Sequence, residues 1–176
     1  MNRVLALTSL LLLALSPAAL QAQTVSVGPV PAADADAEPL PSTMRAPGVP
    51  DPAPVHPELR GVFEDFGGMP GMTALMEDFM AIMLEDRQLR PFFENTDQVR
   101  IKRQLAEQFC AILGGGCTYT GRDMQASHAA FAIDRADFNA LVEALQVAMN
   151  RRGIPFRSQN KLLAILAPMH REVITR

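Results

Sequence analysis

A single histidine, His128, is the residue of this sequence with the clearest capacity for metal chemistry. It lies in the stretch YTGRDMQASHAAFAI, residues 119–133, among small and apolar residues that follow a glycine-rich loop. A neutral imidazole can coordinate a metal through one ring nitrogen while the other N–H donates a hydrogen bond that fixes the ring. Composition by itself favours a plainer role, because a lone histidine in a mostly apolar helical stretch is ordinarily a core residue with one satisfied hydrogen bond.

Cysteine is the second residue type that could do chemistry here. The two cysteines, Cys110 and Cys117, form neither a CxxCH nor a paired CxxC pattern, which disfavours a c-type haem attachment site and a zinc knuckle. In an oxidising compartment they could pair with each other, and a buried free thiol at Cys110 is about equally expected.

The N-terminal region indicates export followed by a tether. Residues 1–22 combine an early positive charge at Arg3, a short apolar run ending near Leu15 and a small residue at Ala22, which is typical of a secretory signal peptide. A membrane anchor is the alternative, but the apolar run is shorter than the roughly 18 to 20 residues that span a bilayer, and no second hydrophobic segment follows. A periplasmic or secreted protein is therefore expected. Residues 23–57 are rich in Pro, Ala, Val and Asp without a helical period, so we expect a flexible linker there.

The remaining residues, 58–176, are expected to form one domain. The chain has 176 residues and a formal net charge of −3, so it lacks the basic excess of a nucleic-acid binder. Apolar residues at three- and four-residue spacing predict helices from Gly71 to Asp86, from Ile101 to Leu113, from Asp134 to near Gly153, and from about Ser158 to Val173. No stretch alternates like a strand, so the predicted fold class is all-α. Pro168 falls inside the last helix and should bend it.

The order and spacing of several short motifs resemble the group I truncated haemoglobins. They are the pair Gly67 and Gly68, the segment DFMAIMLEDRQLRPFF at 78–93, the double glycine after the second long helix, YTG at 119–121 followed by DMQASH, and LAP at 166–168. The resemblance covers about residues 62–174. It implies a truncated globin, a two-over-two helical sandwich around haem b.

The resemblance also assigns residues to the expected haem site. His128 matches the family's proximal iron ligand, and Phe93 matches an aromatic residue packed against the porphyrin face. On the opposite, distal side, Met80 replaces the usual tyrosine and Leu105 replaces a frequent glutamine. Ile101, Gln104 and Phe109 are the neighbouring residues expected to bind the cofactor, with Gln104 at the pocket edge. Methionine has no hydroxyl donor, so strong stabilisation of bound oxygen is not expected.

The function that the resemblance implies is binding of a diatomic gas such as nitric oxide, carbon monoxide or oxygen. The apolar distal wall favours the first two. Oxidation of nitric oxide by oxygen or a peroxidase-like activity would need an electron donor that the sequence does not identify. Two alternatives remain open: an electron-transfer protein with His128 and Met80 as axial ligands, and a haem-free globin fold that acts through interactions.

His170, in LAPMHREV, is a candidate for a covalent link to the cofactor. By spacing alone it is a surface histidine near the chain end, although it shares a helical side with Leu162, Leu166 and Val173. In the cyanobacterial and algal group I globins that this tail resembles, a histidine after a similar Ala-Pro pair can bond to a haem vinyl group once the iron is reduced. The resemblance therefore predicts that His170 can bind haem covalently.

Overall fold

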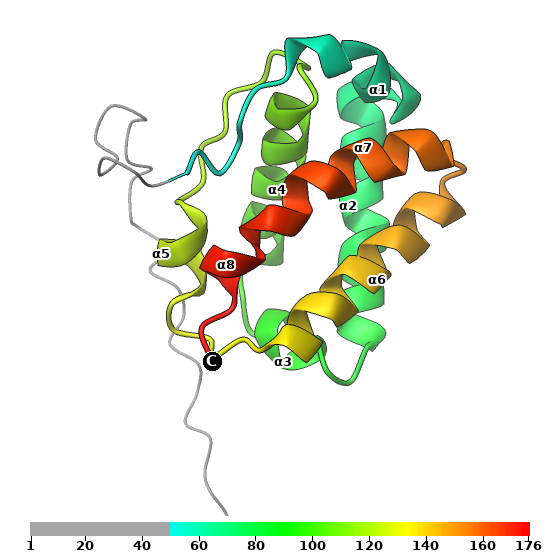
Figure 1. Cartoon of the computed structure of the whole chain (residues 1–176). Coiled ribbons are helices and arrows are strands. Elements are labelled where there is room, and N and C mark those ends of the chain that lie inside the picture. Colours follow the sequence, from blue (N-terminus) through cyan, green and yellow to red (C-terminus); the bar gives the residue numbers. More distant parts are fainter. Residues whose placement is uncertain (1–49) are drawn as a thin grey trace, which may run out of the picture.

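The computed structural model describes residues 50–176, and every regular element within that range is helical (Figure 1). The elements are η2 (Pro57–Leu59), α1 (Arg60–Asp65), α2 (Gly68–Glu85), α3 (Arg90–Phe93), α4 (Gln98–Ile112), α5 (Met124–His128), α6 (Arg135–Arg151), α7 (Phe156–Leu166), η3 (Ala167–Met169) and α8 (His170–Val173). The prediction of an all-α domain is confirmed. The expected signal peptide, residues 1–22, and linker residues 23–49 lie outside the described residues.

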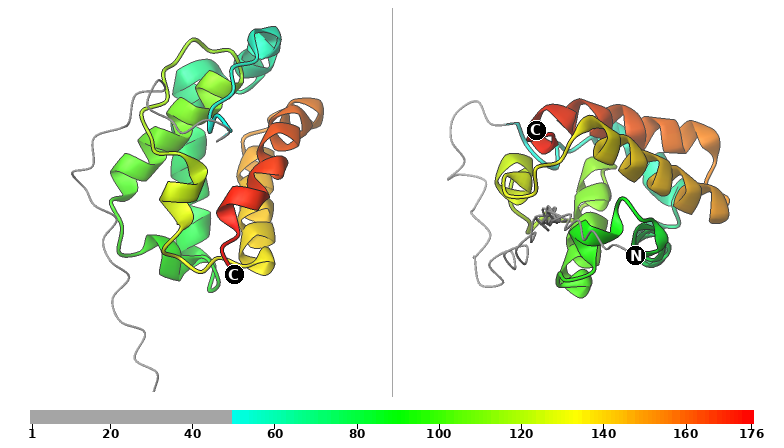
Figure 2. Two further views of the ribbon diagram at one scale, coloured as in Figure 1. Left: turned by 60° about the vertical axis from the view of Figure 1, so that its left-hand side comes forward. Right: turned by 90° about the horizontal axis from the view of Figure 1, so that it is seen from below.

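Two antiparallel helix pairs form two layers. The helices α2 and α4 make one layer, and α6 and α7 make the other, which stacks against the first (Figure 2). The predicted apolar face of α2 supplies much of the interface, because its six residues Met72, Leu75, Met76, Phe79, Met80 and Met83 are all buried. Burial of such side chains contributes about 1.5–3 kcal/mol each and is the main force that holds the layers together.

Local signals set the helix ends close to where the sequence predicts them. Asp134 caps α6, since its carboxylate accepts hydrogen bonds from the backbone N–H groups of Ala136 and Asp137. The helix α4 ends at Ile112 and is followed by Gly114, whose φ of 69° lies in the left-handed region that glycine favours. Pro168 lies in η3, so the predicted last helix is divided into α7, η3 and α8.

The described part of the expected linker, residues 50–57, packs against the helices. Pro52 and Ala53 are buried, and the backbone N–H of His56 donates to the carbonyl of Ile112 at 3.2 Å. The packed chain therefore begins before Glu58. Composition does not predict that this segment is packed, because its backbone carbonyl and amide groups bond to partners on α4 that the sequence does not reveal.

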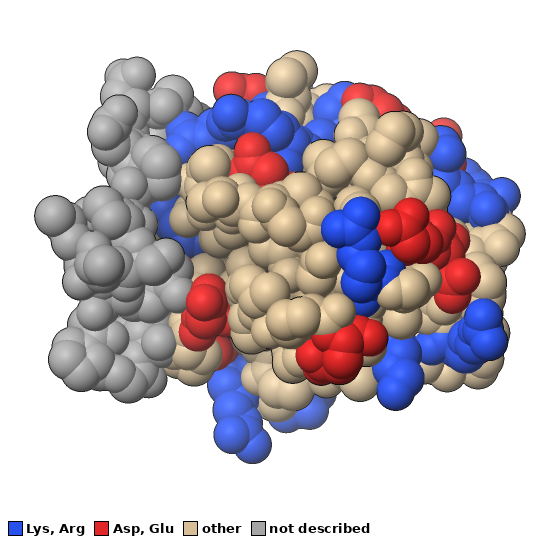
Figure 3. All heavy atoms as spheres, turned by 90° about the horizontal axis from the view of Figure 1, so that it is seen from above, with Lys and Arg blue, Asp and Glu red and all other residues tan. Residues whose placement is uncertain are grey.

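Charged side chains of both signs are interspersed over the face seen from above (Figure 3). Ion pairs of α1 include Arg60 with Glu64 at 2.8 Å and Asp65 with Arg157 of α7 at 3.8 Å. Within residues 50–176, no helix is both long enough and apolar enough to cross a bilayer.

Candidate functional site

The helix α5 ends at His128, and its own backbone determines which ring nitrogen is available. Asp123 caps the helix by accepting from the backbone N–H of Ala126 at 2.7 Å. One turn later, Nδ1 of His128 lies 2.6 Å from the carbonyl oxygen of Met124. A carbonyl can only accept, so Nδ1 carries the hydrogen and Nε2 of the neutral ring keeps its lone pair. This is the tautomer that a metal-ligating histidine needs.

Burial favours the neutral form of this imidazole. Desolvation lowers the pKa of His128 below its usual value, because the surroundings disfavour the charged ring, and the hydrogen bond to Met124 opposes that effect in part. A neutral imidazole is the form that coordinates metals, so the electrostatics of α5 agree with a ligand role.

The apolar face of α4 is covered at one end and only half-covered at the other. Phe109 and Ile112, toward the C-terminal end, are buried. Ile101 and Leu105, on the same face near the N-terminal end, are half-buried and pack at the margin of the core. Gln104 beside them is also half-buried. The protein therefore leaves part of the apolar surface of α4 uncovered.

The second layer has the same gradient of burial. On α6, Leu145 is buried and Leu141 is half-buried; on α7, Leu162 is buried and Leu166 is half-buried. These half-buried residues belong to the N-terminal halves of α4 and α6 and to the C-terminal end of α7, and these helix segments lie toward α3, α5 and α8 (Figure 1). Phe93, the last residue of α3, is half-buried there as well. Several helices thus present incompletely covered apolar side chains at the end where His128 lies, which fits a flat apolar cofactor.

The predicted distal residues supply no hydroxyl. Met80 of α2 is only 3% exposed and belongs to the hydrophobic core. Leu105 and Ile101 of α4 have purely apolar side chains, and Gln104 is the polar residue of the set. The arrangement agrees with an apolar distal wall, while the contacts of these residues with a cofactor stay predictions.

His170 begins α8, which lies beside α5 (Figure 1). Its Nδ1 donates to the carbonyl oxygen of Ala167 at 2.9 Å, so Nε2 of the neutral ring keeps a lone pair. The ring packs edge-on against Phe138 of α6, with ring centroids 6.2 Å apart. The structure thus places the second candidate histidine between α8 and α6, on an element adjacent to that of His128.

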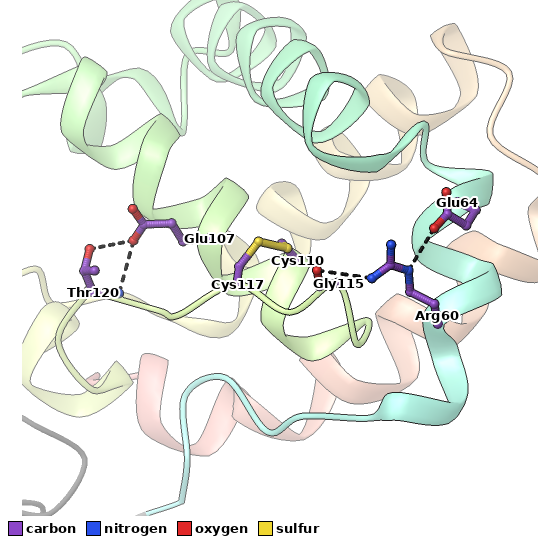
Figure 4. Close-up of a disulfide and its surroundings, with 7 residues drawn as sticks. All are labelled: Arg60, Glu64, Glu107, Cys110, Gly115, Cys117 and Thr120. Carbon is purple, nitrogen blue, oxygen red and sulfur yellow. Dashed lines mark hydrogen bonds and ion pairs between the residues drawn. A yellow bond between two sulfur atoms is a disulfide. The ribbon is translucent and has the colours of Figure 1, made fainter.

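A disulfide and the carboxylate of Glu107 hold the loop before α5 against α4 (Figure 4). Cys110 and Cys117 form a disulfide with their Cα atoms 5.7 Å apart. Of the two alternatives left open by the sequence, a disulfide and a free thiol at Cys110, the structure has the disulfide. The carboxylate of Glu107 accepts from the backbone N–H of Thr120 at 3.1 Å and from its hydroxyl. Sequence reasoning does not identify Glu107, since a charged residue beside an apolar helix face is ordinarily solvated.

Comparison with known proteins agrees with this geometry. The family model described as bacterial-like globin matches residues 61–175. A group 1 truncated haemoglobin of Mycolicibacterium paratuberculosis is 30% identical over 118 residues, covering 67% of this chain and 87% of the relative.

Two solved structures share the fold. The truncated haemoglobin of Tetrahymena pyriformis in its Fe(III) form has a TM-score of 0.62 at 23% identity, covering 65% of this chain and 98% of the other. The 2/2 haemoglobin of Synechococcus sp. PCC 7002, solved in the cyanomet state with covalently attached haem, has a TM-score of 0.61 at 22% identity, with the same coverage. The two-over-two arrangement of helices predicted from the sequence is confirmed.

Proposed function

Because this chain belongs to the bacterial-like globin family and to its group 1 truncated haemoglobins, we propose that it is a b-type haem protein in which His128 is the iron ligand. The observation that carries the proposal is the fixed neutral tautomer of His128, set by its hydrogen bond to the carbonyl of Met124. Half-covered apolar side chains at the same end of the molecule support it, because they would be buried by a porphyrin.

Bound haem supplies an iron atom that can take a diatomic gas. The chain's own residues would hold and shield the group. Phe93, Ile101, Leu105 and Phe109 provide apolar contacts that exclude water, and the carbonyl of Met124 orients the imidazole. Met80 and Leu105 have no donor for a partly charged oxygen ligand, so we propose nitric oxide or carbon monoxide as the preferred ligand over oxygen. Oxidation of nitric oxide, peroxidase-like turnover and an electron donor stay predictions of the family resemblance.

Haem titration of two histidine variants tests the ligand assignment. The wild-type protein and His170→Ala are expected to bind added haemin with a Soret band, whereas His128→Ala is expected to lose stable binding or to need external imidazole. Unchanged Soret absorbance in His128→Ala would mean that the proximal assignment is wrong. A wild-type protein that takes up no haemin would instead support the haem-free alternative.

The ferric visible spectrum separates gas binding from electron transfer. A high-spin, water-bound spectrum is expected if the position opposite His128 is open to ligands. A sulfur-to-iron charge-transfer band would support ligation by Met80 and the electron-transfer alternative. The burial of Met80, which is 3% exposed and lies in the core with other methionines, agrees with a core-packing role for its side chain.

We also propose that His170 can bond covalently to haem. The hydrogen bond from Nδ1–H of His170 leaves Nε2 as a nucleophile on the element next to α5, and the Synechococcus structure was solved with covalently attached haem. The bond from Nε2 to a vinyl carbon would replace the vinyl double bond, whose other carbon would take up one proton while the imidazole ring released one. After reduction with dithionite, acid butanone should leave haem with the wild-type protein and extract it from His170→Ala. Complete extraction from the wild-type protein, together with an intact mass equal to that of the apoprotein, would contradict the proposal.

Export of the protein is part of the same proposal. The N-terminal sequence is typical of a secretory signal, and the Cys110–Cys117 disulfide supports a periplasmic or secreted location, because disulfides persist mainly in oxidising compartments.

A further inference from the structure

A buried glutamine on α4 joins two segments that are far apart in the sequence. Gln108 is only 3% exposed. Its side-chain amide Nε2 donates to the carbonyl oxygen of Pro52 at 2.6 Å and lies 3.8 Å from the sulfur of Met124. A buried amide is costly unless it is hydrogen-bonded, so these contacts determine where the residue can sit. Gln108 therefore ties α4 both to the segment before the helices and to α5.

The segment that Gln108 holds precedes the part of the chain that matches the family model. That match covers residues 61–175, whereas Pro52 and Ala53 are buried and His56 donates its backbone N–H to Ile112. The segment also passes close to the end of α4, since a Cβ on Gly114 would lie 2.7 Å from the carbonyl oxygen of His56. Residues 50–57 are thus built into the domain.

The other contact of Gln108 leads to the candidate iron ligand. Met124 is 8% exposed and starts α5, and its carbonyl oxygen accepts the hydrogen bond that orients His128. A helix of five residues has little stability of its own, so its position depends on the side chains packed against it. Gln108, which is itself held by Pro52, is among the groups that hold the first residue of this helix in place.

We propose that Gln108 is a positioning residue for His128, and that residues 50–57 form part of the haem site by fixing Gln108 against Met124. The inference rests on the proposed role of His128 as haem ligand. Groups that hydrogen-bond a metal ligand directly typically change metal affinity by about 10- to 100-fold when they are replaced, and Gln108 acts on such a group, the carbonyl of Met124, by holding that residue.

A matched pair of glutamine variants tests this role. Gln108→Met keeps the length of the side chain and removes its donor. The control is Gln159→Met, because Gln159 of α7 is also 3% exposed and its Nε2 donates to Asn150 and to the carbonyl of Ile154, away from α5. Both variants are expected to lose stability. Only Gln108→Met is expected to lose haem about tenfold faster, to shift the iron–histidine stretching frequency of the ferrous protein, and to speed amide exchange in residues 124–128 of the haem-free protein.

A second variant acts on the segment that carries Pro52, the other partner of Gln108. Ala53→Glu places a charge where the side chain is 5% exposed, which should displace residues 50–57 and reproduce the three effects of Gln108→Met. Because the two changes act through one contact, their effects on haem loss should not add in the double variant. Equal effects of the two glutamine variants, or an unchanged rate of haem loss in Gln108→Met, would overturn the proposal.

The two proposals can fail separately. If the wild-type protein bound no haemin, the proposed function would fail, while amide exchange in α5 of the haem-free protein would still report whether Gln108 holds that helix. Unchanged exchange in Gln108→Met would overturn the positioning role by itself.

Discussion

At the scale of single residues, one backbone carbonyl determines the chemistry of His128. Because the oxygen of Met124 can only accept, it fixes the hydrogen on Nδ1, and burial lowers the pKa of the ring. The same helix end without that bond would leave both tautomers accessible. In a residue that the sequence marks only as a histidine among small neighbours, a contact within its own helix thus leaves Nε2 available for the proposed ligation.

The residue-scale prediction concerns the missing distal hydroxyl. Met80→Tyr introduces an O–H donor at a buried position of α2. If the hydroxyl reaches the ligand, it should stabilise bound oxygen by one hydrogen bond, about 1–2 kcal/mol. The rate of oxygen dissociation should then fall roughly tenfold. Stopped-flow measurement of oxygen release checks this. Met80→Phe, which adds a ring without the donor, is the control, and equal rates in the two variants would show that the hydroxyl does not reach the ligand.

At the scale of elements, α5 depends on α4 for its position. The loop between them is joined to α4 by the disulfide and by Glu107, and α5 itself is contacted by Gln108. These groups lie on the last two turns of α4. This part of the helix therefore contacts both the loop that leads to α5 and α5 itself, which carries the candidate ligand. A short helix can be placed accurately in this way although it would not form in isolation.

The disulfide should therefore contribute measurably to stability. It closes a short loop, with a sequence separation of 7, for which the chain-entropy model gives about 2.5 kcal/mol. Cys117→Ser leaves Cys110 as a small buried thiol and is expected to lower the free energy of unfolding by about that amount in urea titrations. Dithiothreitol should destabilise the wild-type protein similarly and leave the variant unchanged. Identical wild-type unfolding curves with and without the reductant would contradict the prediction.

At the scale of the whole molecule, burial is uneven. The core between the two layers is tightly covered around Leu75, Met149 and Leu162, whereas the end with α3, α5 and α8 leaves apolar side chains half-exposed. Regions with less apolar burial open more easily. The partly exposed apolar side chains of α4, α6 and α7 on that side are therefore the surface that the proposed haem would cover.

Hydrogen exchange of the haem-free protein should reveal this difference. Amides of α2 and of the C-terminal half of α4 are expected to exchange slowest, and those of α5 and α8 fastest. Haem should slow exchange mainly in α5 and α8, and at a free haem concentration about 100 times Kd it should stabilise the protein by about 2.7 kcal/mol. Uniform protection by haem across all helices, or none, would contradict the idea that this end is the binding site.

The sequence by itself determined the helix positions and helix ends, because these depend on residues close together in the chain. Apolar spacing placed the long helices, Asp134 set the start of α6, and Gly114 followed the end of α4, because these signals act within one or two turns. His128 could be proposed as a ligand from the order of motifs around it. The sequence also predicted a bend at Pro168, where the structure divides the helix.

Only the tertiary structure decided how distant polar groups pair. Gln108 is buried because it meets Pro52, 56 residues earlier in the chain, and residues 50–57 are packed because α4 offers them partners. The same holds for the Cys110–Cys117 pairing, which needs the chain to fold back after Gly114. A hydrogen bond or disulfide forms only when both partners are brought within a few ångströms, and that distance is set by the packing of the whole domain, which helical periodicity does not encode.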